Sequence, residues 1–155
     1  MSGKACPCTS GRAYADCCAP YHRGEREAPT PEALMRSRFA AFARADASYL
    51  WRTLHPDHED RARADRTRSE TEVLRELRDG ARSRRYMRLT VLEAREDRVL
   101  FLASVFQKGR DVSFVELSRF AHDGVGWRYL SGVGRAAGEV DDPKRLTIDA
   151  FERAL

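Results

Sequence analysis

Hydrophobic residues recur every three or four positions in the first half of the chain and every second position in much of the second half. A Thr-Pro pair suits the cap and first turn of a helix, and Met35, Phe39 and Phe42 then form one apolar stripe. This spacing predicts a helix over residues 31–45.

Two further helices are expected before residue 85. Asp46 can cap the first of them, which should end at the His-Pro pair that follows. Ser69 and Glu72 form a capping box that opens the second, and Gly80 is expected to end it.

From residue 86 the period changes to two, which is typical of strands. Met87, Leu89 and Val91 alternate with polar neighbours and should share one face of the first strand. Short turns between the strands predict an antiparallel meander with the helices packed on it, which is an α+β fold. We expect strands at 86–95, 99–107, 112–121 and 127–133, a loop over 134–145 and a closing helix over 146–155.

Composition narrows the class of protein. The 155-residue chain is 42% hydrophobic and 34% charged, with a formal net charge of +4. It contains no apolar run of the roughly 18 residues that a membrane span needs, and residues 1–20 lack a signal-type apolar stretch. We therefore expect a cytoplasmic protein with one main core. Basic residues alternate with acids, as in 59–66, and no RNA-binding motif is present, so nucleic-acid binding is not indicated.

The sharpest chemical signal is a cysteine cluster, in which Cys6-Pro-Cys8 and Cys17-Cys18 are separated by eight residues. Thiolates are soft ligands that favour zinc or iron–sulfur centres, and four of them complete a tetrahedral shell. A Ser-Gly turn between the two pairs lets one loop close around one ion. The spacing predicts one structural Zn²⁺ per chain, because four protein ligands leave no open position for a substrate.

Alternatives exist for these cysteines and for a second metal site. An iron–sulfur centre, disulfides or unliganded thiols would also use the four thiols, although a reducing compartment disfavours disulfides. His22 would replace Cys18 as a ligand only if Cys18 points away. His55 and His58 precede acidic residues, but the proline between them prevents the regular helical spacing of a metal pair.

The segment from Cys6 to Cys18, with its Thr-Ser-Gly turn and Tyr14, resembles the SEC-C motif. This zinc knuckle also occurs at the C-terminus of the SecA translocation motor, where it contacts a chaperone. The resemblance implies a protein partner for residues 1–24, which we call the knuckle. A polar connection that contains two prolines separates the knuckle from a domain over residues 31–155.

That domain resembles the YchJ family of bacterial proteins in the segments Leu34-Met-Arg-Ser-Arg-Phe39, 46–56, 116–120 and Gly126-Trp-Arg-Tyr129. Members combine SEC-C knuckles with a cone-shaped domain related to nuclear transport factor 2 and ketosteroid isomerase. The resemblance implies helices packed on a curved antiparallel sheet. Some members carry a second knuckle, but this chain has no cysteine after Cys18, so one zinc is implied.

Strand alternation also places Glu116 on the same face as Phe114 and Phe120. If that face is buried, the carboxylate needs a partner. We favour an ion pair with an arginine that fixes a helix to the sheet. The alternative is a ligand pocket, with Glu116 and a histidine as acid–base groups and an arginine holding an anion. The candidate residues are Arg36, Arg38, His55, Glu116 and Arg119.

Two functions from different classes follow from these features. The preferred one is a zinc-binding interaction or adaptor protein that contacts another protein through the knuckle. The alternative is a small-molecule-binding protein or enzyme that uses a pocket in the cone. No nucleophile–base pair, phosphate-binding loop or open metal site can be assigned, which leaves enzymatic activity undecided.

Overall fold

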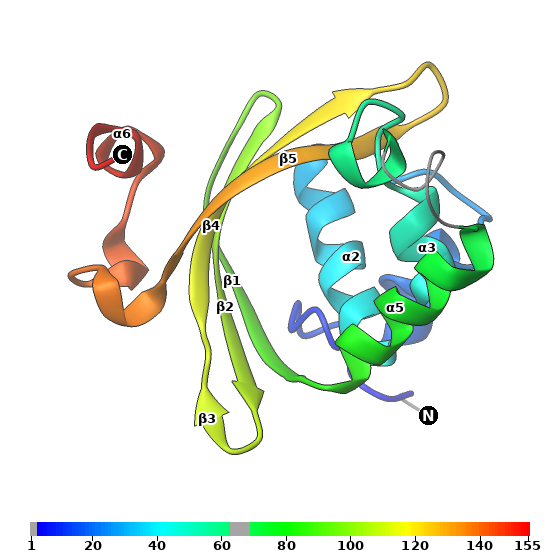
Figure 1. Ribbon diagram of the computed structural model, residues 1–155, viewed down its shortest axis with the longest axis horizontal. Coiled ribbons are helices and arrows are strands. Elements are labelled where there is room, and N and C mark those ends of the chain that lie inside the picture. Colours follow the sequence, from blue (N-terminus) through cyan, green and yellow to red (C-terminus); the bar gives the residue numbers. More distant parts are fainter. Residues whose placement is uncertain (1–2, 63–68) are drawn as a thin grey trace.

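Helices α2, α3 and α5 cover one face of an antiparallel sheet, and the C-terminal helix α6 lies against the other face (Figure 1). The computed structural model describes residues 3–62 and 69–155. The helices are α2 (Pro31–Arg44), α3 (Ala47–Arg52), α5 (Glu70–Arg82) and α6 (Ile148–Arg153). The strands are β1 (Arg85–Arg95), β2 (Arg98–Gln107), β3 (Arg110–Asp111), β4 (Phe114–His122) and β5 (Trp127–Ala136). The expected α+β fold class is confirmed.

The sheet has the order β1-β2-β4-β5 with antiparallel neighbours, and β3 pairs with the end of β2. The strand expected over 112–121 is therefore interrupted near its start. Asp111 accepts a hydrogen bond from the Ser113 N–H at 2.9 Å, and the Ser113 hydroxyl accepts one from Val105 N–H at 3.1 Å. These side-chain bonds replace ladder bonds, which separates β3 from β4.

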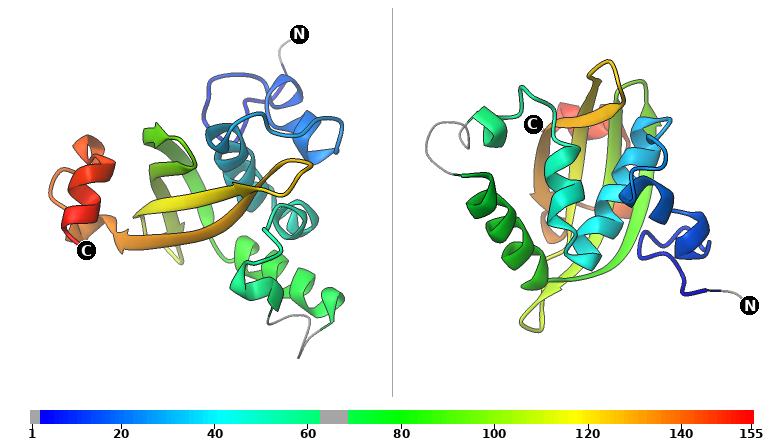
Figure 2. Two further views of the ribbon diagram at one scale, coloured as in Figure 1. Left: turned by 90° about the horizontal axis from the view of Figure 1, so that it is seen from above. Right: turned by 90° about the vertical axis from the view of Figure 1, so that its right-hand side faces the viewer.

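Helix α2 lies at the centre of the molecule, between the sheet and the other helices (Figure 2). Met35 and Phe39 of the predicted stripe are buried against the sheet. Ser37, Arg38 and Ala40 are buried as well, because α3 and the knuckle cover further sides of the helix. An amphipathic surface helix would leave these positions exposed.

Both faces of β2 are buried, which explains its nearly continuous apolar run. Val99, Phe101 and Ala103 belong to the main core beneath α2, whereas Leu100 and Leu102 pack with α6. Successive side chains of a strand point to opposite faces, so a strand between two layers needs apolar residues at every position.

Three further details of the sequence prediction are wrong. Met87 is 49% exposed, because a register shift between Tyr86 and Arg88 breaks the alternation that Leu89 and Val91 follow. Helix α5 passes Gly80 and ends at Arg82, since the buried Ala81 continues its packed face. Strand β5 extends to Ala136, where a loop was expected, because its last residues pair with β4. None of the described helices is long and apolar enough to cross a membrane.

Candidate metal centre

The first two cysteines lie in a tight N-terminal loop. Cys6 N–H donates to the carbonyl of Arg12 at 2.9 Å, and Thr9 N–H donates to the carbonyl of Cys6 at 3.0 Å. Gly11 closes the loop with a φ of +89°, a backbone conformation that residues other than glycine rarely adopt. The Ser-Gly turn predicted from the sequence thus bends the chain back after Cys8.

A 3₁₀ turn, η1 (Tyr14–Asp16), and a short helix, α1 (Ala19–His22), bring the second pair of cysteines to the first. Cys17 and Cys18 occupy the junction between these two elements. All four thiols are free of disulfides, and all four cysteines are buried.

The four sulfur atoms have the separation that a tetrahedral metal site requires. All lie within 4.8 Å of one another, with 3.6 Å between the sulfurs of Cys8 and Cys17 and 3.9 Å between those of Cys17 and Cys18. A tetrahedron with Zn–S bonds of about 2.3 Å places its sulfurs about 3.8 Å apart. The Ser10 hydroxyl lies 3.3 Å from the Cys17 sulfur, as an outer-shell hydrogen-bond partner would.

The sulfurs also perturb one another electrostatically. Hydrogen bonding with Cys18 lowers the pKa of Cys8, whereas the hydrogen bonds with Cys6 and Cys8 raise the pKa of Cys18. Several thiolates in one buried cluster repel each other unless a cation compensates them. A bound divalent cation compensates this repulsion between thiolates, and its binding releases protons from the thiols.

His22 is not available as a metal ligand, because both of its ring nitrogens have partners. Its Nε2 lies 2.8 Å from the carbonyl oxygen of Ser37, and its Nδ1 lies 2.6 Å from the Tyr14 hydroxyl. A carbonyl only accepts, so Nε2 carries the proton and Tyr14 donates to Nδ1. Burial lowers the pKa of His22, which favours this neutral form.

No second metal centre is found among the residues that the structure describes, where the four cysteines are the only group of three or more ligating side chains placed to hold an ion. His55 and His58 each accept a hydrogen bond from a backbone N–H two residues later in the chain. Their acidic neighbours therefore form a polar loop, and the histidines cap its turns.

The knuckle is attached to the rest of the molecule by the packing of its cysteines and by hydrogen bonds of Thr9, Tyr21 and His22. The cysteines pack on the fully buried Ala40 of α2. On its other side, the Thr9 hydroxyl lies 3.1 Å from both the backbone nitrogen and the backbone oxygen of Leu89 in β1. The candidate metal site therefore lies between α2 and the edge of the sheet.

The candidate residues in the cone do not form one cluster. Arg38 and Glu116 line the same cavity between α2 and the sheet, but no ion pair joins them. Arg36 instead bonds Glu32 on the surface of α2, and Arg119 is exposed. The His55 ring lies in the polar loop after α3.

The expected ion pair of Glu116 with a helix arginine is therefore a wrong prediction. Its Oε2 accepts hydrogen bonds from the hydroxyls of Tyr129 at 2.8 Å and Ser118 at 2.5 Å. Burial and the charge of Glu116 raise the pKa of Tyr129, which keeps its hydroxyl protonated as the donor. Strand alternation identifies the face on which Glu116 lies, but it carries no information about the hydroxyls that reach it.

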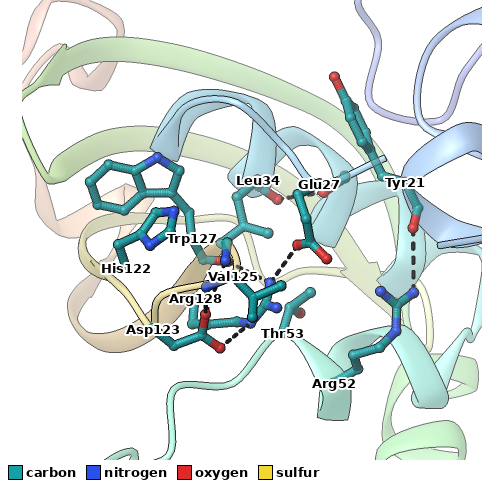
Figure 3. A network of polar contacts seen from close by, with 12 residues as sticks. Tyr21, Glu27, Leu34, Arg52, Thr53, His122, Asp123, Val125, Trp127 and Arg128 are labelled. Atoms are coloured by element: carbon teal, nitrogen blue, oxygen red, sulfur yellow. Dashed lines mark hydrogen bonds and ion pairs between the residues drawn. The ribbon is translucent and has the colours of Figure 1, made fainter. Parts of the chain in front are cut away.

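Sequence reasoning missed a buried arginine in β5. Arg128 is 6% exposed and donates to Glu27 at 2.8 Å and to Asp123 at 2.9 Å (Figure 3). Burial opposes ionisation of Asp123, but hydrogen bonds from the N–H groups of Gly126 and Val125, together with the charge of Arg128, lower its pKa to about 2. Asp123 lies close to Arg128 in the sequence, but Glu27 is 101 residues away, and no local pattern indicates that the fold brings it to Arg128.

Known proteins share both parts of this arrangement. The family model described as "YchJ, middle NTF2-like domain" matches residues 30–132, and the SEC-C motif matches residues 4–20. A UPF0225 protein of Deinococcus radiodurans is 45% identical over 128 residues, which cover 82% of this chain and 87% of the relative.

Two solved structures have the same fold. The solution structure of a SEC-C motif containing protein from Rhodopseudomonas palustris aligns with a TM-score of 0.68 at 33% identity, covering 86% of this chain and 98% of that chain. The crystal structure of a SEC-C motif containing protein from Psychrobacter arcticus aligns with a TM-score of 0.62 at 22% identity, covering 83% and 81% of the two chains.

Proposed function

This chain belongs to the YchJ-like family and carries its SEC-C motif at the N-terminus, and from that premise we propose that it is a zinc-binding interaction protein. One structural Zn²⁺, bound by Cys6, Cys8, Cys17 and Cys18, holds the knuckle folded. The folded knuckle then presents its outer surface to a partner protein in the cytoplasm.

The observation that carries the zinc assignment is the separation of the sulfurs. Distances of 3.6 Å and 3.9 Å bracket the tetrahedral value of about 3.8 Å. A disulfide needs about 2.05 Å between its sulfurs, so oxidised pairs do not describe this cluster. Four cysteine ligands also complete the tetrahedral coordination shell. The site therefore has a structural role, because no coordination position is left for a reacting water.

The metal has a structural role because the knuckle has almost no other core. Its buried cluster consists of the four cysteines with Ala40 of α2, and Tyr14 packs beside them. Structural zinc in small peptides contributes roughly 10–16 kcal/mol of apparent binding free energy. Without the ion, we expect little to hold the loop and the two short helical turns together.

The loop that faces solvent supports the proposal of a partner surface. Ser10, Gly11 and Arg12 are exposed at the tip of the knuckle, whereas the opposite side is fixed to α2 and β1. A loop that a bound metal ion already holds in one conformation loses little further conformational entropy when a partner binds it, which favours binding.

Metal analysis tests the zinc assignment. Protein purified without added zinc should contain about one equivalent of Zn²⁺ per chain, measured by mass spectrometry. Cys8→Ser should reduce this content strongly, whereas His22→Gln, which removes the rejected ligand, should retain it. One equivalent of iron, or the absence of metal in a folded and reduced knuckle, would overturn the assignment.

A site-specific photo-crosslinker tests the partner proposal separately. Placed at Arg12 in the knuckle, it should give a discrete protein adduct in cells, and the adduct should disappear in the Cys8→Ser background. The same group at Arg110, in the distant β2–β3 hairpin, should give no adduct of that mass. Adducts that form equally at both positions would contradict a partner surface on the knuckle.

A further inference from the structure

A small cavity lies between α2 and the inner face of the sheet, away from the cysteines. Its volume is about 170 Å³. Its apolar walls are Met35, Phe39, Phe42, Tyr86, Phe101 and Phe114. Arg38, Glu116 and Tyr129 supply its polar end, and the exposed Arg84 marks its rim.

The apolar walls are suited to a flat ring. Phe42 and Tyr86 stack with their ring centroids 5.4 Å apart, and Phe101 and Phe114 meet edge to face at 6.0 Å. A cavity of about 150 Å³ lined by apolar side chains is large enough to admit benzene. This cavity therefore has room for one six-membered ring with a small substituent.

Arg38 brings a buried cation with unused donors to the polar end. The residue is 5% exposed, and its Nη1 donates to the carbonyl of Leu50 at 2.9 Å and to the hydroxyl of Thr53 at 2.6 Å. Within residues 3–62 and 69–155, its Nε and Nη2 have no hydrogen-bond partner and no carboxylate lies at ion-pair distance. The Tyr129 ring covers one face of the guanidinium, at 4.8 Å. A guanidinium that lines a cavity with donors not used by the protein favours a ligand oxygen there.

Glu116 brings an unused acceptor to the same end. Its Oε2 takes the hydrogen bonds from Tyr129 and Ser118, whereas its Oε1 has no partner among the described residues. An ionised carboxylate accepts on both oxygens. The cavity therefore offers donors from Arg38 and an acceptor from Glu116 beside one flat apolar space.

We propose that this cavity binds a small aromatic carboxamide or lactam, with its carbonyl oxygen on Arg38, its N–H on Glu116 and its ring between the aromatic walls. A carboxylate would satisfy Arg38 but would meet the negative charge of Glu116. A cation would satisfy Glu116 but would meet the charge of Arg38. A neutral amide matches both groups, and this binding is independent of the metal centre.

Three molecules of nearly equal shape test the proposal on the zinc-loaded full chain. Benzamide, benzoate and benzamidine share one ring and differ in the donors, acceptors and charge of the attached group. In a titration followed by NMR, benzamide should bind about tenfold more tightly than either ion, which corresponds to one mismatched polar contact. The shifted signals should come from residues that line the cavity. A preference for either ion, or no saturable shift at the cavity, would overturn the proposal.

Glu116→Gln tests the role assigned to the carboxylate. The variant removes the charge that repels benzoate, keeps an acceptor for Tyr129 and adds an amide donor, so benzoate should then bind at least as tightly as benzamide. Arg36→Gln, on the exposed side of the same helix, should leave the preference for benzamide unchanged. An unaltered ratio in Glu116→Gln would contradict the proposal. If the Glu116→Gln variant fails to fold, the comparison of the three probes on the unmodified chain still decides whether the proposal holds.

Discussion

Gly132 is a position at which even one methyl group has no room. A Cβ there would lie 2.3 Å from Oε2 of Glu116 and 2.4 Å from the hydroxyl of Tyr129. These two atoms are hydrogen-bonded to each other, so neither can move away without weakening that bond. The glycine therefore makes space for the polar end of the cavity.

Gly132→Ala should consequently destabilise the protein. Overpacking in a well-packed interior typically costs about 1–3 kcal/mol of unfolding free energy. Chemical denaturation of the variant measures this cost. Gly134→Ala, on the same strand, is the matched control, because its Cβ would meet only the Val115 carbonyl at an ordinary 3.5 Å. Equal losses in both variants would contradict the role given to Gly132.

His22 makes stability depend on pH through a single ring. Burial lowers its pKa in the folded protein below the ordinary value of 6.5, so the unfolded chain binds a proton first as pH falls. The free energy of unfolding should therefore decrease below about pH 6.5, and this decrease ends once the folded-state pKa is passed.

A comparison with His22→Gln isolates this contribution. Unfolding experiments at pH 7.5 and pH 5.5 should show a smaller decrease in stability for the variant. His58, whose pKa burial also lowers, is present in both proteins and cancels from the difference. The same pH dependence in the two proteins would show that His22 is not held neutral by the fold.

The sequence identified the metal-site candidates much better than it identified the partners of buried charges. Four cysteines within thirteen residues can reach only one another, so their spacing alone brings them together. Glu116 and Arg128 instead each have one partner that is distant in the sequence, Tyr129 and Glu27 respectively. A single sequence shows which face such a residue occupies, but not which hydroxyl or carboxylate the fold brings to it.

At the scale of elements, the contact between the knuckle and β1 depends on one side chain. The Thr9 hydroxyl accepts from the N–H of Leu89, on the edge strand of the sheet, and its one proton is shared between the carbonyls of Cys8 at 2.7 Å and Leu89 at 3.1 Å. Thr9→Val keeps the shape of the side chain but leaves both backbone groups without these partners. At about 1 kcal/mol for each hydrogen bond, the variant should lose about 2 kcal/mol of unfolding free energy.

Hydrogen exchange provides a local measurement of the same contact. The Leu89 amide should exchange faster in Thr9→Val, whereas amides in the middle of β4 should change only with global stability. Thr9→Ser retains the hydroxyl and should behave like the unmodified protein. Unchanged protection of Leu89 in Thr9→Val would mean that the knuckle does not cover this edge in solution.

Elements with strong local signals were predicted well, and their irregularities were not. The capped helices and the alternating strands depend on residues close in the sequence, which is why α2 and β2 lie where the pattern places them. The break at residues 112–113 and the register shift at Met87 depend on hydrogen bonds with the neighbouring strand. The burial of α2 on several sides likewise requires the knuckle and α3 to be in place.

At the scale of the whole molecule, each edge of the sheet is contacted at one point by another part of the chain. The residues after α3 pair with the outer edge of β5. There the Tyr129 N–H donates to the backbone carbonyl of Thr53 at 2.8 Å, and the backbone carbonyl of Tyr129 accepts from the His55 N–H at 2.9 Å. The knuckle contacts the edge of β1 through Thr9. Exposed strand edges are sites of unwanted pairing, so the knuckle, by contacting β1, limits access to this edge.

Removal of the metal tests whether the knuckle and the cone are separate modules, as the polar connection over 24–31 predicts. The two contacts with Leu89, the bond from His22 to Ser37 and the two bonds from Arg52 to the carbonyls of Tyr21 and His22 cross between the two parts. At about 1 kcal/mol each, their loss should lower the stability of the cone by about 5 kcal/mol and leave its unfolding cooperative. Thermal melting with and without a chelator measures this change. Cys8→Ser should melt near the chelated protein and respond little to the chelator. An unchanged melting temperature would mean that the modules are independent, and loss of the whole transition would mean that the knuckle belongs to the core of the cone.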